Sequence, residues 1–411
     1  MIDNTKPPTI GQVTAGNSFD VATAGFDVTI VGGGIQGAGI AQAACAAGYR
    51  TLLIERAEWA SATSHASSKL IHGGLRYLES GQLNLVYHSL QERQHLLRNA
   101  PRLVKAVRFY IPIYRYTQRR PWQIRAGLSL YALLTGLHPQ ARFRSVPRAE
   151  WPALSGLKQQ DLQAVFQYWD GQTDDAALTR AVVDSATQLG AQCVQHCELI
   201  AAQHIADDRY RLQLRSDNTL WNCETRALVN ATGPWVNELL KRCTPAPPQR
   251  ALSWVKGTHI ALPSAPLPGI FYLEAPRDGR AVFVMPWQGK TLVGTTEVEV
   301  DNPRVEPSQA EIDYLLDTVR HYFPAFPLTV LDSFAGVRVL PSGGAPGKKE
   351  RPFSRARESV ITEFDAGDAA LISIYGGKLT TYRHTAEQVV DLLQKKLGRK
   401  KKIADTKNLS L

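Results

Sequence analysis

The sequence predicts an α/β domain that is discontinuous along the chain, combined with a second domain built mainly of antiparallel β-strands. Three observations lead to this prediction. Residues 26–55 form a glycine-containing strand–helix–strand pattern, which is typical of a parallel α/β sheet. Residues 251–335 are rich in β-branched and aromatic residues, with a turn signal at Gln288-Gly289. An apolar strand at Leu371–Tyr375, followed by Gly376-Gly377 and a helical pattern, returns the chain to the first domain.

The strand–helix–strand pattern consists of an apolar strand at Asp27–Val31, a helix of small residues at Ile35–Ala47 and a second strand at Thr51–Ile54. The turn before the helix carries glycines in G-x-G-x-x-G spacing, namely Gly32, Gly34 and Gly37. Such glycines allow close approach of the backbone to a pyrophosphate, and the helix N-terminus offers N–H donors to the phosphates. Glu55 ends the second strand, where a carboxylate can accept hydrogen bonds from an adenosine ribose. The pattern therefore predicts a Rossmann-like dinucleotide-binding domain.

Length, charge and cysteine content narrow the class of protein. A chain of 411 residues exceeds the usual size of one core, so we expect two domains. The net charge of +10 is consistent with a generally basic surface, or with an anionic substrate, an anionic cofactor or an acidic membrane face. We expect no nucleic-acid partner, because the basic residues follow no nucleic-acid-binding motif. The five cysteines are odd in number and contain no C-x-x-C pair, which favours a reducing, cytoplasmic compartment and no structural metal.

The ends of the chain and one apolar stretch bear on membrane contact. Residues 1–25 lack the basic and apolar regions of a signal peptide, so we expect a disordered lead-in. No run of 18 apolar residues occurs, so we expect no membrane span. The stretch Ala126–Leu137, with Trp122 and a basic flank, is consistent with an interfacial membrane segment or with a helix buried between domains. The basic run Lys395–Lys402 is consistent with a solvated face or, alternatively, with attraction to anionic lipid.

A second segment, SSKLIHGGLRYLE at 67–79, is dense in functional side chains and follows a run of small hydroxyl residues at 61–68. Placed after GGGIQGAGI, it resembles the flavin-dependent glycerol-3-phosphate dehydrogenases, within the D-amino-acid-oxidase-like flavoprotein superfamily. Later segments agree with the same resemblance: LVNATGPWVNELL at 228–240, VKGTHI at 255–260, VFVMPWQGKTLVGTTEVE at 282–299, FAGVRVL at 334–340 and YGGKLTTYR at 375–383.

The resemblance implies FAD as cofactor and oxidation of sn-glycerol 3-phosphate to dihydroxyacetone phosphate by hydride transfer to the flavin N5. Electrons would pass to quinone or another acceptor, and the protein would sit peripherally on the inner face of the cell membrane. Relatives of this family usually continue into a C-terminal helical domain, so we expect a short form. Two alternatives stay open: an FAD-dependent oxidase of another small hydroxy acid or amine, and a flavin-binding protein without turnover.

The expected domains and elements follow from these patterns. The FAD-binding domain is expected to comprise 26–100, 165–250 and 336–395, the substrate-binding cap 101–164 and 251–335, and the basic tail 396–411. Helices are expected at Leu83–Leu97, Leu178–Leu189 and Glu311–Tyr322, a polar loop at Pro341–Arg351, and a last helix that opens at Gly376-Gly377-Lys378.

The site residues are implied mainly by the resemblance. The expected FAD contacts are Gly32, Gly34, Gly37, Glu55, Ser67, Ser68, Ala231, Thr232, Gly233, Gly376, Gly377, Lys378, Leu379 and Thr380. A helix that opens at Gly377 would direct its N–H groups toward the flavin N1 and O2, where negative charge develops.

The substrate needs cations for its phosphate and a base for its C2 hydroxyl. Arginine binds phosphate bidentately, so the residues expected to bind the phosphate are Arg76, Arg338 and Arg355. Tyr77 would add a hydroxyl donor and Lys378 a further charge. His259 is the expected base and Lys378 the competing one, and Arg338 completes the expected catalytic set.

Overall fold

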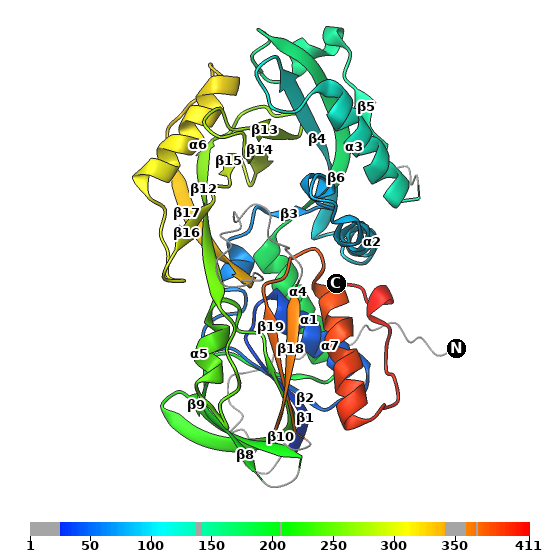
Figure 1. Cartoon of the computed structure of the whole chain (residues 1–411), viewed down its shortest axis with the longest axis vertical. Coiled ribbons are helices and arrows are strands. Elements are labelled where there is room, and N and C mark those ends of the chain that lie inside the picture. The colour runs from blue at the N-terminus through cyan, green and yellow to red at the C-terminus, as the bar shows by residue number, and fades with distance from the viewer. Residues whose placement is uncertain (1–24, 137–141, 206–207, 342–358, 367–368) are drawn as a thin grey trace, which may run out of the picture.

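The computed structural model describes residues 25–136, 142–205, 208–341, 359–366 and 369–411, and their strands form two sheets in two lobes (Figure 1). The predicted lead-in lies outside the described residues except for Gly25, which begins the first strand. The predicted loop at 341–351 also lies outside them except for Pro341, which ends a strand. The two-sheet architecture confirms the predicted fold class.

The first sheet has nine strands, and its central strands run parallel in the order β7-β2-β1-β10-β19. These strands and the antiparallel edge strand β18 are β1 Gly25–Val31, β2 Thr51–Ile54, β7 Gln192–Val194, β10 Thr219–Asn230, β18 Val360–Ala366 and β19 Ala369–Tyr375. Because the strands are parallel, β1, β2, β10 and β19 all end at the same edge of the sheet. The glycine turns after β1, β10 and β19 therefore meet at this edge, together with Glu55 after β2.

Layers of helix and strand cover the two faces of this sheet. On one face lie α1 Ile35–Ala46, α4 Asp175–Gln188 and α7 Tyr382–Leu397, which share one apolar core with the sheet. On the other face lie β8 Cys197–Ile205 and β9 Arg209–Ser216, which continue antiparallel from the first half of β10, with β11 Cys243–Thr244 at the edge and α5 Val236–Leu240 nearby. Small residues in α1 allow close packing, since a Cβ on Gly39 would lie 2.4 Å from the Tyr382 ring.

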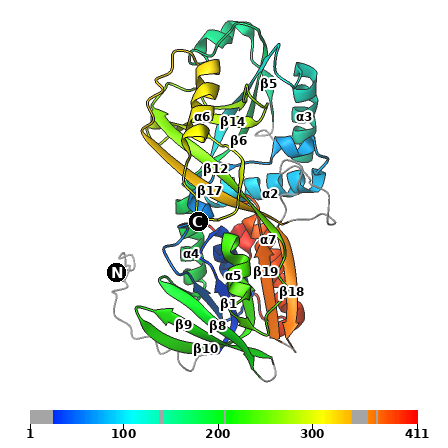
Figure 2. The ribbon, with the colours of Figure 1, turned by 60° about the vertical axis from the view of Figure 1, so that its left-hand side comes forward.

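The second sheet has ten strands and is antiparallel except where β13 pairs with β4. Its strands are β3 Leu70–Ile71, β4 Val104–Tyr114, β5 Arg144–Ser145, β6 Leu162–Thr173, β12 Leu252–Pro263, β13 Ile270–Glu274, β14 Ala281–Trp287, β15 Lys290–Gly294, β16 Val298–Val300 and β17 Asp332–Pro341. Helix α6, Gln309–Tyr322, packs on one face. Helices α2, Leu83–Asn99, and α3, Pro121–Leu134, pack on the other (Figure 2).

The limits of the two sheets differ from the predicted domain limits. Besides the short β3, residues 165–173 of β6 and 336–341 of β17 belong to the second sheet, although all of these were expected in the FAD-binding domain. Strand β6 pairs along its whole length with β4, and β17 pairs along its whole length with β12. The sequences of these long strands do not reveal this pairing. We retain the two-domain division as a proposal, with its limits moved to the ends of these strands.

One predicted element is wrong in position. The last helix, α7, begins at Tyr382, because Gly376 and Gly377 have positive φ angles of 75° and 112° that an α-helix excludes. The basic residues of the run 395–402 are exposed, as a solvated face requires, while the backbone of the tail packs back on the α/β domain. Gly398 accepts a hydrogen bond from the Tyr49 hydroxyl at 2.7 Å, and the Ile403 amide donates to the Ala46 carbonyl at 2.7 Å.

Candidate functional site

The glycine turn after β1 forms one wall of the site. Gly32 has φ 114°, and a Cβ on Gly37 would lie 1.8 Å from the Gly32 carbonyl oxygen, so the turn and the helix touch through backbone. Glu55, at the end of β2, accepts hydrogen bonds from the Gly33 amide at 2.6 Å and the Ala57 amide at 2.9 Å. The turn and the carboxylate therefore occupy fixed positions at the same edge of the sheet.

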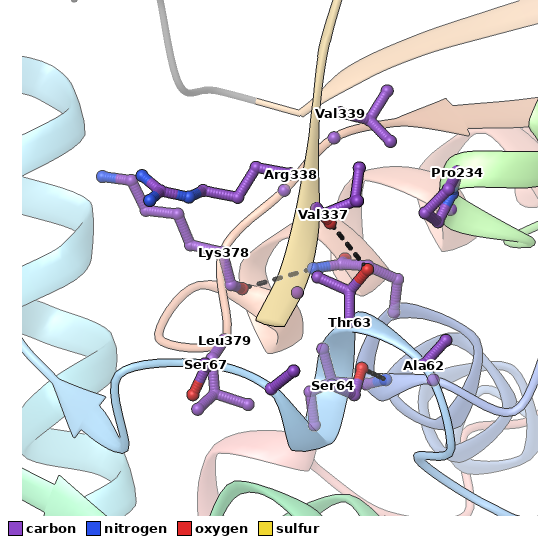
Figure 3. Close-up of a pocket in the computed structure, with 18 of the residues that line it drawn as sticks. Ala62, Thr63, Ser64, Ser67, Pro234, Val337, Arg338, Val339, Lys378 and Leu379 are labelled. Carbon is purple, nitrogen blue, oxygen red and sulfur yellow. Dashed lines mark hydrogen bonds between the residues drawn. The ribbon is translucent and has the colours of Figure 1, made fainter. Parts of the chain in front are cut away.

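The hydroxyl-rich segment 61–68 lies across the start of α1. Ser64 Oγ accepts a hydrogen bond from the Ile35 amide at 2.9 Å, and Thr63 Oγ1 donates to the Val337 carbonyl at 2.7 Å (Figure 3). The density of hydroxyl residues in the sequence indicated this segment, but neither Ser64 nor Thr63 was predicted individually. The segment links the glycine turn of the first sheet to β17 of the second.

The expected contacts Ser67 and Ser68 are both held by buried partners. Ser67 donates from its amide at 3.0 Å and its hydroxyl at 2.6 Å to one carboxylate oxygen of Asp175. Lys69 Nζ lies 2.6 Å from the other oxygen, in a pair whose side chains are 10% and 0% exposed. Ser68 Oγ lies 3.0 Å from His259 Nε2. Asp175 therefore fixes the position of this loop, which the sequence alone did not indicate.

The turn after β10 touches the first glycine turn. Asn230 is fully buried, and its side chain accepts from the Thr232 hydroxyl at 2.7 Å and donates to the Val236 carbonyl at 2.8 Å. A Cβ on Gly32 would lie 2.5 Å from the Ala231 carbonyl oxygen. The structure thus brings Ala231, Thr232 and Gly233 beside the glycine turn as expected from the sequence.

The loop between β19 and α7 completes this end of the site. Gln36 Nε2, in the first turn of α1, donates to the Lys378 carbonyl at 3.2 Å, and the His72 amide donates to Thr380 Oγ1 at 3.3 Å. Since α7 starts at Tyr382, no helix N-terminus opens at Gly377. Any hydrogen-bond donors toward a ligand here come from the loop itself.

The expected cations meet where the second sheet approaches this loop. Arg338, on β17, pairs with Glu297 at 2.9 Å, and Arg76, in the short helical turn Leu75–Leu78, lies 3.8 Å from the same carboxylate oxygen. Lys378 Nζ lies 3.8 Å above the centre of the Tyr77 ring. The Arg338 and Lys378 side chains extend to the same side in the close-up (Figure 3). Arg355, which was also expected to bind the phosphate, lies outside the described residues.

His259, on β12, is buried and stacks on Phe334 with ring centres 5.0 Å apart. Burial, together with the positive charges of Arg338 and Lys69, lowers the pKa of His259 from 6.5 to about 3. The imidazole is therefore neutral at pH 7 and can accept a proton, although its affinity for one is low.

A buried network supports the segment that carries Arg76 and Tyr77. Arg93 on α2 pairs with Asp170 on β6 at 2.6 Å, and the Tyr131 hydroxyl on α3 donates to the same carboxylate at 2.7 Å. The Gly73 amide donates to the Tyr131 hydroxyl at 2.8 Å. These contacts fix the backbone just before Arg76, and nothing local in the sequence indicated them.

One continuous cavity of about 850 Å³ joins these features. It is lined at one end by Glu55 and the glycine turns and at the other by Arg76, Lys378, His259 and Arg338. Aromatic side chains from the second sheet, Phe109, Tyr168, Tyr272 and Phe283, close the latter end. The cavity therefore spans both domains, with a nucleotide-type wall at one end and a cationic, aromatic chamber at the other.

Comparisons with a family model and with known proteins identify relatives of this chain. Residues 27–383 match the DAO family, described as FAD dependent oxidoreductase. The chain is 37% identical to a glycerol-3-phosphate dehydrogenase of Synechocystis, over 93% of this chain and 72% of that protein, and 36% identical to one of Pseudomonas aeruginosa, over 90% and 72%.

The similarity extends to solved structures. A glycerol-3-phosphate dehydrogenase from Bacillus halodurans, complexed with FAD, aligns with a TM-score of 0.71 at 27% identity, over 93% of this chain and 67% of that one. An L-α-glycerophosphate oxidase from Mycoplasma pneumoniae aligns with a TM-score of 0.73 at 18% identity, over 90% and 95%, which shows a shared fold.

Proposed function

This chain belongs to the DAO family of FAD-dependent oxidoreductases and, within it, to the glycerol-3-phosphate dehydrogenases, and we propose that it oxidises sn-glycerol 3-phosphate to dihydroxyacetone phosphate. One observation carries the proposal. Arg76, Arg338 and Lys378 line the same cavity as the glycine turns, so a phosphate ester held by these cations would share that cavity with a dinucleotide.

The residues present fit FAD. Gly32 and Gly34 line the cavity and carry no side chain, so a pyrophosphate can approach the backbone there, and Glu55 is oriented by two amides at the position suited to a ribose. Ala231, Thr232 and Gly233 would hold the middle of the cofactor, and the loop from Gly376 to Thr380 its flavin end. FAD, when bound, supplies the two-electron acceptor for the hydride from C2.

The side chains at the cationic end have distinct proposed roles. Arg76 and Arg338 hold the phosphate, with Tyr77 beside them. Lys378 contributes charge rather than accepting a proton, because its contact with the Tyr77 ring face is one that favours an ammonium group. His259 accepts the proton of the C2 hydroxyl at Nε2, directly or through the Ser68 hydroxyl that contacts it at 3.0 Å.

We further propose that electrons pass to quinone or another acceptor and that the protein lies peripherally on the inner, cytoplasmic face of the cell membrane. None of the described helices is both long and apolar enough to cross a bilayer. Helix α3 lies on the outside of the second lobe rather than between the domains, as Figure 1 shows. It exposes Trp122 (70%) and Leu133 (61%) on one stripe, which supports interfacial contact.

Steady-state turnover tests the proposed reaction. Purified protein supplied with sn-glycerol 3-phosphate and a soluble electron acceptor should form one dihydroxyacetone phosphate for every two electrons transferred. Turnover of a hydroxy acid or amine in preference to the phosphate ester would favour the oxidase alternative. Absence of turnover with every donor, in protein that retains FAD, would favour a flavin-binding protein.

A further inference from the structure

A carboxylate occupies the place between the two proposed phosphate-binding arginines. Glu297 Oε1 lies 2.9 Å from an Arg338 guanidinium nitrogen and 3.8 Å from one of Arg76. The Glu297 side chain is 8% exposed, and all three residues line the cavity. A carboxylate presents its oxygens to a guanidinium much as a phosphate does, so it uses the donors that a phosphate would need.

The fold holds the Glu297 backbone in place. The neighbouring Thr296 side chain donates to Glu311 at 2.7 Å and accepts from the Thr258 amide at 2.9 Å. Arg280 donates to the Glu297 carbonyl at 2.6 Å. These contacts involve buried or partly buried groups on β12, on α6 and in the loop before β14, so the segment does not owe its position to Arg76 or Arg338.

The adjacent strand also makes room for Arg338. A Cβ on Gly257 would lie 2.9 Å from Arg338 Nη2 and 2.4 Å from Thr295 Oγ1, so a larger residue there would displace the arginine from Glu297. The carboxylate, its anchored backbone and the glycine opposite therefore form one arrangement.

We propose that Glu297 competes with the substrate phosphate for Arg338 and releases this arginine only to a dianion. The proposal rests on the function proposed above. A phosphate monoester carries a charge of about −1.5 to −2 at pH 7, more than a single carboxylate, so it can displace Glu297 from Arg338. A neutral polyol or a monoanionic hydroxy acid gains no such advantage, so Glu297 selects for phosphorylated substrates at the expense of affinity.

The test replaces the carboxylate by an amide of the same shape. Glu297→Gln should bind inorganic phosphate about tenfold more tightly than wild type, because one charged competitor for the arginine is removed. The dissociation constant is read from perturbation of the bound-FAD absorbance and from the rise in melting temperature on adding phosphate. The same variant should lower KM for glycerol 3-phosphate and narrow the preference for it over a hydroxy acid such as glycerate.

Glu299→Gln is the matched control, since Glu299 is exposed on the same segment and does not line the cavity. It should leave phosphate binding unchanged. If Glu297→Gln loses FAD, Glu297→Asp is the alternative variant, because it retracts the carboxylate by one methylene. Its affinity for phosphate should lie between that of wild type and that of a site without the competing carboxylate.

The outcomes separate this proposal from the proposed reaction. The competitor role would be overturned if Glu297→Gln binds phosphate no more tightly than wild type, since Glu297 would then merely hold the arginines in position. If Glu297→Gln does not hold FAD, the same result in Glu297→Asp would overturn it. Failure of glycerol 3-phosphate to reduce wild-type FAD would overturn the reaction, while the phosphate-binding comparison would still report on Glu297.

Discussion

At the scale of single residues, Arg76 and Arg338 come from distant parts of the chain and converge on one carboxylate in the cavity. We expect Arg76→Ala and Arg338→Ala each to lower kcat/KM for glycerol 3-phosphate. Leaving a buried phosphate oxygen unpaired should cost about 2–5 kcal/mol, or roughly 30- to several-thousand-fold. Steady-state kinetics with glycerol as a second substrate measures this loss.

Two controls identify the cause of that loss. Arg→Lys at either position should rescue poorly, because a point charge cannot make the two-pronged contact. Activity on glycerol should fall much less, and FAD content should remain near wild type. Equal losses on glycerol and glycerol 3-phosphate would contradict a role in phosphate binding.

His259 gives the protein a pH dependence of known sign. Its pKa is about 3 in the folded protein against an ordinary 6.5, so between these values the unfolded chain binds a proton that the folded chain does not. Stability is therefore lost as the pH falls below 6.5, by up to about 1.4 kcal/mol per pH unit from this group. Between pH 7 and 5, the free energy of unfolding of His259→Asn should therefore fall by roughly 2 kcal/mol less than that of wild type.

Melting temperatures at a series of pH values provide the measurement. His196→Asn is a suitable control, because His196 is exposed beside Glu58 and has φ 53°, which asparagine tolerates. The same acid slope in His259→Asn and wild type would show that His259 is not the group responsible.

At the scale of elements, one buried ion pair ties the hydroxyl-rich loop to helix α4. The Asp175 carboxylate accepts from Lys69 and from both donors of Ser67. Breaking a buried pair by removing one charge costs about 3–5 kcal/mol, so Asp175→Asn should lower the melting temperature and loosen FAD. Fluorescence of released flavin during thermal unfolding follows both effects.

Asp184→Asn, an exposed change on the same helix, should alter stability by no more than about 0.5 kcal/mol. If Asp175→Asn keeps wild-type FAD affinity and melting temperature, the ion pair is dispensable for the loop.

Helix α3 carries the proposed membrane contact. The double variant Trp122→Gln, Leu133→Gln should reduce co-sedimentation with anionic vesicles at low salt by about tenfold, because large apolar side chains lose their burial in the interface. Leu220→Gln, at an exposed site on β10 in the other lobe, should not change it. Equal pelleting of all three proteins would show that α3 is not the contact.

Elements were predictable where the pattern is local. The strand, glycines and helix around Gly32 follow from spacing, and the structure reproduces them within two residues. The start of α7 was wrong because the glycine pair before it adopts left-handed backbone, and a glycine pair can open a helix or precede one. Residues 165–173 were expected in the FAD-binding domain, whereas the pairing of β6 with β4, which no local pattern indicates, places them in the second sheet.

At the scale of the whole molecule, the site depends on contacts that cross the two lobes. The residues of motifs that the family shares could be named from the sequence, and those in the described structure line one cavity, except Gly37, which packs against the Gly32 carbonyl. Glu297, Asp175 and Tyr131 could not, since each acts through partners far away in the chain. Glu297 lies in a recognised segment, but its place between two arginines is set by how β16 and β17 both pair with β12.

The central claim is that one cavity holds FAD and a phosphorylated three-carbon alcohol together. Anaerobic mixing of the FAD-loaded protein with sn-glycerol 3-phosphate tests it most directly. We predict saturable loss of the oxidised flavin absorbance, with one dihydroxyacetone phosphate formed per flavin. Flavin that stays oxidised with glycerol 3-phosphate but is reduced by a hydroxy acid or an amine would contradict the claim.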